Sequence, residues 1–177
     1  FFALYARAGE GPAVARALEG PIDPVDYEGA MGCPVPNAGL PRFRACAFHA
    51  AYPLAQVALS DPDVPVTARL DAFTPFIPAD ADASGYPGAM LRWTLTNTTR
   101  ETVTASICGT LPPLTGDADA VCLARHTGDT GGLPAEASAK AGSAGLRGVL
   151  LMNAANRAGT EAWGTLALAT TAEDVTV

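Results

Sequence analysis

Residues 52–97 decide the fold of this chain, and they read YPLAQVALSDPDVPVTARLDAFTPFIPADADASGYPGAMLRWTLTN. Apolar and polar side chains alternate within 64–73 and again within 89–96. In the first segment, one side of an extended chain carries Val66, Ala68, Leu70 and Ala72. Alternation with a period of two is typical of strands with one buried face and one wet face. Antiparallel sheets favour this arrangement more than buried parallel sheets do, so the stretch predicts antiparallel strands.

The composition fits one domain built from short strands and turns. The chain has 177 residues, of which 49% are hydrophobic, and its mean hydropathy is +0.18. Its 15 prolines and 18 glycines cluster between the alternating segments, as in a sandwich or barrel. No segment of about ten residues carries a helical period. We therefore expect residues 1–177 to form a single all-β domain, an antiparallel β-sandwich of two packed sheets without substantial helix.

Ten segments carry a strand signal. They are residues 1–7, 13–18, 43–49, 54–60, 64–73, 89–96, 102–108, 147–152, 164–170 and 175–177. The turn residues between neighbouring segments predict three hairpins, within 1–18, 54–73 and 89–108. Residues 109–145 have the weakest periodicity, and we expect a long connection there.

The charge of the chain excludes several partners. Its net charge is −7, its pI is about 4.6, and it has no cluster of Lys and Arg. Such a chain lacks the basic surface that binds nucleic acid, and anionic membranes would repel it. No apolar run reaches the roughly 20 residues of a membrane-spanning helix. No signal peptide is visible before residues 1–7, which favours a cytoplasmic location, and we expect the chain to be a piece of a longer protein.

The four cysteines show no spacing typical of a metal site. They are Cys33, Cys46, Cys108 and Cys122. Four cysteines can pair in three ways, and the sequence does not choose among them. Cys46 and Cys108 fall in strand segments, so we interpret them as small buried hydrophobic residues. We expect free thiols.

Residues 80–85, DADASG, resemble the first half of a calcium-binding loop. The twelfth position should hold a bidentate glutamate, but it is Leu91, and no helices are predicted on either side. A surface turn, in which Asp80 and Ser84 bond to backbone groups, explains the pattern better. We therefore predict no metal site.

Neither the other carboxylates nor the histidines form a recognisable catalytic pattern. Aspartate pairs recur at Asp61/Asp63, Asp80/Asp82 and Asp117/Asp119. A glycosidase needs two carboxyl groups roughly 5–10 Å apart across a sugar, and local turn spacing does not establish this geometry. His49 and His126 lack metal-ligand spacing, and no glycine-rich nucleotide motif is present. We predict no cofactor.

The aromatic residues give a weak signal for sugar binding. Trp93 lies on the apolar side of its segment, so we expect it to pack in the core. Tyr86 lies in a glycine-rich loop and is the better candidate for exposure.

The loops and strands together resemble a known family. The matching segments are GLPRFR (39–44), YP (52–53), SDPDVPV (60–66), AFTPFIPADADASGYP (72–87), LRWTLTN (91–97), FFALYAR (1–7) and WGTLALATTAEDVTV (163–177). This combination resembles the N-terminal β-sandwich domain of glycoside hydrolase family 116, the group of bile-acid (non-lysosomal) glucosylceramidases and β-glucosidases. Residues 20–38 and 109–145 do not match its pattern.

The resemblance implies a supersandwich-like domain that precedes an (α/α)6-barrel catalytic domain. It also implies a retaining mechanism with a Glu nucleophile and an Asp acid/base, both in the helical domain, so this chain is predicted to be inactive alone. It would contact the catalytic domain of the same polypeptide, and the carbohydrate substrate only indirectly. Two alternatives remain open: an independent carbohydrate-binding or adhesive sandwich, and a hydrolase that is complete in itself.

The loop at 74–87 is the predicted contact with the catalytic domain. Its candidate residues are Pro75, Phe76, Ile77, Pro78, Asp80, Asp82 and Tyr86. Phe76 and Ile77, held between two prolines, would form a rigid apolar knob, and the two aspartates would offer polar partners.

Overall fold

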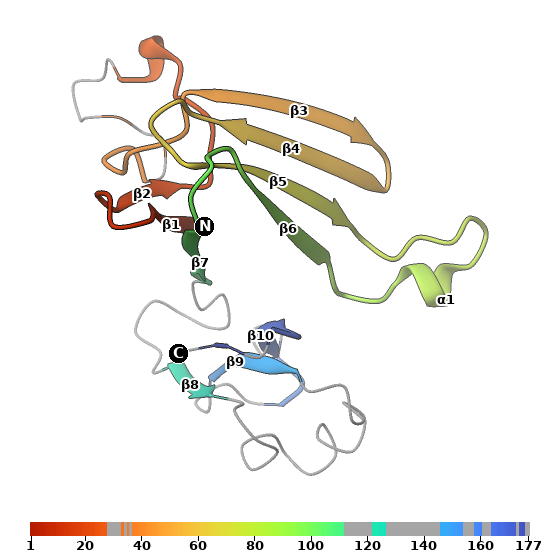
Figure 1. The fold of residues 1–177 in the computed structure, drawn as a ribbon. Coiled ribbons are helices and arrows are strands. Elements are labelled where there is room, and N and C mark those ends of the chain that lie inside the picture. The colour runs from red at the N-terminus through yellow and green to blue at the C-terminus, as the bar shows by residue number, and fades with distance from the viewer. Residues whose placement is uncertain are drawn as a thin grey trace. The chain divides into compact units, whose positions relative to one another are not determined.

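The computed structural model describes residues 1–27, 33, 35, 37–111, 122–126, 146–153, 158–160, 164–172 and 174–175. The chain divides into two compact units, Phe1–Gly109 and Thr110–Val177. The predicted all-β class is confirmed, because the strands form antiparallel sheets (Figure 1). In the described part of the chain, the only helical segments are a 3-10 turn at Pro24–Tyr27 and α1, Ala81–Ser84.

One sheet of the first unit has three strands. It contains β1 (Phe2–Ala8), β2 (Val14–Ala17) and β7 (Val103–Gly109) in the order β2-β1-β7. The predicted opening hairpin is confirmed by the antiparallel pairing of β1 with β2. Gly9, in the turn between them, has a φ of +48°, which a residue with a side chain rarely adopts.

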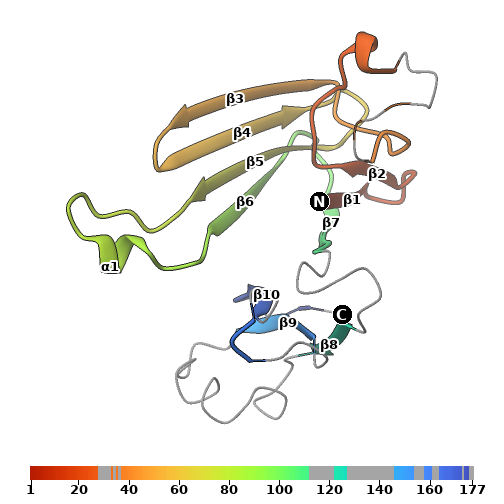
Figure 2. The same ribbon diagram turned by 180° about the vertical axis from the view of Figure 1, so that it is seen from behind.

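The other sheet of the first unit is a four-stranded meander. Its strands are β3 (Ala45–Ala51), β4 (Leu54–Ser60), β5 (Val66–Phe73) and β6 (Met90–Asn97), in the order β3-β4-β5-β6. The predicted hairpin at 54–73 is confirmed as β4 and β5. Figure 2 shows the four strands from behind, with the β5–β6 connection and α1 extending beyond one end of the sheet.

The predicted hairpin at 89–108 is wrong. Its two strands exist, but β6 pairs with β5, whereas β7 pairs with β1 in the other sheet. Between them the Asn97 side chain donates to the Glu101 carbonyl at 2.7 Å and accepts from the Thr99 amide at 2.8 Å. This turn carries the chain from one layer to the other. The strands can therefore contribute apolar residues to one core from opposite sides.

The core of the first unit lies between its two sheets. Its buried members are Leu4, Ala6, Leu18, Phe43, Leu59, Val64, Val66 and Ala68. Trp93 packs against this cluster, as predicted, and its ring meets that of Phe2 edge-on with centroids 5.7 Å apart. The alternation in the sequence is thus confirmed, since Val66 and Ala68 face inward while Arg69 is exposed.

A buried carboxylate joins the two sheets. Asp61, in the β4–β5 turn, has a side chain that is only 1% exposed. It accepts a hydrogen bond from Arg16 on β2 at 3.5 Å and one from the Asp63 amide at 2.9 Å, and Arg44 lies 3.8 Å away. Burial by itself raises the pKa of the Asp61 carboxyl group. The hydrogen bond from Asp63 and the charges of Arg44 and Arg16 outweigh burial, so this pKa lies below its ordinary value.

Asp61 makes the stability of the first unit depend on pH. Because its folded pKa is below its unfolded pKa, the unfolded state binds more protons, and stability rises with pH through this interval. We expect the contribution of Asp61 to the free energy of unfolding to have its full value above about pH 5 and to decrease as the pH falls below about 4. Urea unfolding from pH 3 to pH 7 measures it. An Asp61→Asn variant with the same pH slope as the original protein would contradict this assignment.

The second unit holds one described sheet of three strands. These are β8 (Cys122–His126), β9 (Arg147–Asn153) and β10 (Thr165–Thr170), in the order β10-β9-β8. Strands were predicted for β9 and β10, but β8 was missed, because its five residues, CLARH, are too few to show a clear alternation. The strand predicted at 175–177 is wrong at Val175, and its last two residues lie outside the described part.

The cysteines confirm one prediction and contradict another. Cys33, Cys46 and Cys108 are free thiols, but Cys46 and Cys108 are exposed rather than buried. Cys46 lies on β3, which is the edge strand of its sheet. Cys108 follows Ile107, a β7 residue that packs against the core, so its side chain points to the opposite face. The side chain of Cys122 lies outside the described part of the structure. Among the described helices, none is long and apolar enough to cross a membrane.

Candidate functional site

The loop between β5 and β6 is fixed by its own side chains. The Asp80 carboxylate caps α1 by accepting a hydrogen bond from the Ala83 amide at 2.9 Å. The Ser84 hydroxyl both accepts from the Ile77 amide and donates to the Ile77 carbonyl, each at 3.0 Å. The interpretation of DADASG as a turn with capping side chains is thereby confirmed. Asp82 lies in the first turn of α1.

The structure leaves most of the predicted contact residues exposed. Phe76 is 42% exposed, Ile77 53% and Tyr86 69%. Pro78, Asp80 and Asp82 are also exposed, whereas Pro75 is half-buried. The ring of Phe76 meets that of Tyr52, in the β3–β4 turn, edge-on at a centroid distance of 5.1 Å. The loop therefore presents apolar side chains from a defined backbone.

The loop belongs to a larger apolar surface that the sequence analysis did not find. In the described part of the chain, nine of the fifteen large exposed apolar side chains lie between residues 48 and 91. We call seven of them, at one end of the four-stranded sheet, the distal apolar patch: Tyr52, Leu54, Phe73, Phe76, Ile77, Tyr86 and Met90. Leu54, Phe73 and Met90 are cross-strand neighbours. The sequence did contain a signal for this surface. Phe73 follows Asp71 by two residues, so it is a large apolar residue on the strand face that was predicted to be exposed to solvent.

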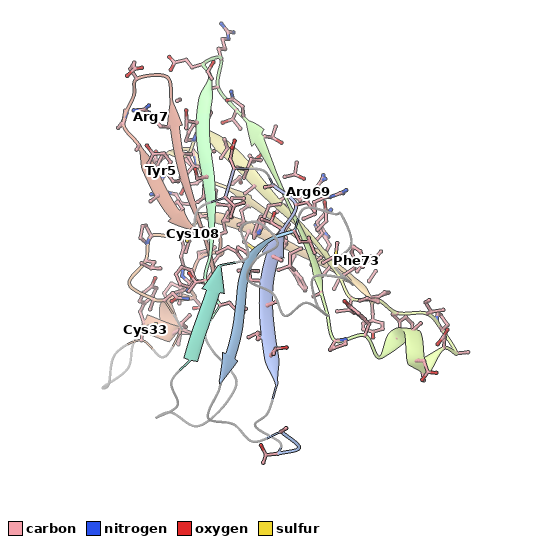
Figure 3. The ribbon with its side chains drawn as sticks, turned by 90° about the horizontal axis from the view of Figure 1, so that it is seen from below. Tyr5, Arg7, Cys33, Arg69, Phe73 and Cys108 are labelled. Carbon is pink, nitrogen blue, oxygen red and sulfur yellow. The ribbon has the colours of Figure 1, made fainter. Side chains whose placement is uncertain are left out.

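A row of polar side chains lies next to this patch. The strand register places His49, Gln56, Asp71 and Arg92 side by side across all four strands. Their face is opposite the core, and we call it the outer face. Figure 3 labels Arg69 and Phe73, which project from β5 on this face. An open depression of about 690 Å³ contains the whole row and reaches Leu54, Phe73 and Met90.

Asp71 is the electrostatic centre of the row. It accepts hydrogen bonds from Gln56 at 2.8 Å, Arg69 at 3.2 Å and Arg92 at 3.3 Å. The hydrogen bond from Gln56 lowers the pKa of the Asp71 carboxyl group, and the two arginines lower it further against the opposing effect of desolvation. Asp71 is therefore ionised at neutral pH. Its contacts are those of a carboxylate in a cluster of ion pairs, not those of a general acid.

The carboxylates singled out in the sequence are not brought together. Asp61 is buried beneath Arg16 and Arg44, Asp63 pairs with Arg44, and Asp80 caps α1. Asp117 and Asp119 lie outside the described residues, as does the side chain of His126. No group of three or more metal-ligating side chains occurs within the described residues.

The whole sequence, residues 1–177, matches the family described as beta-glucosidase 2, glycosyl-hydrolase family 116 N-term. The chain belongs to this family. The resemblance seen in its loops is thereby confirmed over the full length. No curated protein matches the sequence.

Membership of glycoside hydrolase family 116 as an N-terminal domain is consistent with a non-catalytic domain of a glycoside hydrolase. This membership also suggests that a catalytic domain belongs to the same polypeptide. A family 116 N-terminal domain would then need a surface suited to protein contact. The distal apolar patch is suited to such contact, because exposed apolar side chains gathered on one part of a surface mark interaction sites.

Proposed function

We propose that this chain is a non-catalytic support domain that docks on the (α/α)6 catalytic domain of the same polypeptide through the distal apolar patch. The parent enzyme is a retaining glycoside hydrolase that acts on β-glucosides or glucosylceramide-like substrates. The observation that carries the proposal is the concentration of exposed apolar side chains at one end of the four-stranded sheet. The contact loop supplies Phe76, Ile77 and Tyr86, and the strand ends supply the rest.

The rigidity of the loop favours docking over a mobile role. The Asp80 cap and the two Ser84 hydrogen bonds hold the loop backbone before any partner arrives. A partner then loses less conformational entropy when it orders the interface. The roles of the described carboxylates support the non-catalytic assignment, because Asp61, Asp71 and Asp80 are each bound to backbone or basic groups of this chain.

Replacing Phe76 and Ile77 together by serine tests the docking role in the full-length enzyme. We expect the variant to lose about 3 kcal/mol of stability at the interface, since burial of a large apolar side chain contributes roughly 1.5–3 kcal/mol. Thermal unfolding and hydrolysis of a chromogenic β-glucoside measure the effect. The matched control is Val25→Ser with Tyr27→Ser, two apolar residues that are 67% and 51% exposed outside the patch. Unchanged melting temperature and activity in the Phe76/Ile77 variant would sink the proposal.

Glycan binding is the alternative function, and the outer face is the observation in its favour. Its depression contains planar polar side chains of the kind that hydrogen-bond to sugar hydroxyls. Sugar-binding faces also need exposed aromatic rings in a row, and Phe73 is the sole Phe, Tyr or Trp among the residues that line this depression. A titration of the chain with β-glucosides and oligosaccharides distinguishes the two functions.

A further inference from the structure

We draw no further inference here: the strongest candidate, the outer face of the four-stranded sheet with its polar row and its open depression, carries none, because nothing in the described part of the structure shows which segment of this polypeptide or which partner covers it.

Discussion

The Phe43→Ala variant of the 177-residue chain is expected to unfold with a free energy lower by about 3–5 kcal/mol. Phe43 is 0% exposed and is among the largest fully buried side chains of the core. Its amide also donates to the Glu19 carbonyl at 3.1 Å, which ties its backbone to the end of β2. Truncation leaves a cavity between two sheets that are each fixed by backbone pairing, so the site cannot collapse to fill it. Urea unfolding followed by tryptophan fluorescence measures the loss, because Trp93 packs on the same cluster.

Phe48→Ala is the matched control for this prediction. The two residues are five positions apart, but Phe48 lies on β3 with 64% of its surface exposed. Its truncation in the same 177-residue chain should cost less than about 1 kcal/mol, because little apolar area returns to water. Equal losses of unfolding free energy in the two variants would show that Phe43 does not lie in the core.

Asp61→Ala is expected to lower the free energy of unfolding by about 3 kcal/mol, near the low end for breaking a buried ion pair. The low end applies because Arg16 and Arg44, with side chains 17% and 61% exposed, can still reach water. The variant also removes the acceptor of the Asp63 amide, which fixes the β4–β5 turn. Urea unfolding at pH 7 measures the change.

The adjacent pair Arg44 and Asp63 provides the control. Asp63 has a side chain that is 54% exposed, and its partner Arg44 is 61% exposed. Since exposed ion pairs contribute about 0–1 kcal/mol, Asp63→Ala should cost far less than Asp61→Ala. Asp61→Asn should fall between them, because it keeps the acceptor for the Asp63 amide but loses the charge. If Asp63→Ala and Asp61→Ala lowered the free energy of unfolding equally, burial would not explain the effect of Asp61→Ala.

The contact loop shows what local sequence predicts well. Asp80 and Ser84 bond to groups within seven residues of themselves, so the turn at 80–85 follows from short-range chemistry. The rest of the distal apolar patch comes from β3–β4, β5 and β6, which the meander brings to one end of the sheet. The polar row has the same origin, since the pairing of Gln56 with Asp71 and of Asp71 with Arg92 depends on strand register.

Local sequence was enough to predict which residues of β5 and β6 face the core, because side chains alternate between the two faces of any strand, whatever its neighbours are. It also determined the family, through loop segments that are specific in combination. Tertiary structure alone decided that β7 leaves β6 to pair with β1, that Asp61 is buried beneath Arg16, and that Cys46 is exposed on an edge strand. The physical reason is common to all three. Each depends on contacts between segments far apart in the chain, and no local pattern encodes which strand becomes a neighbour.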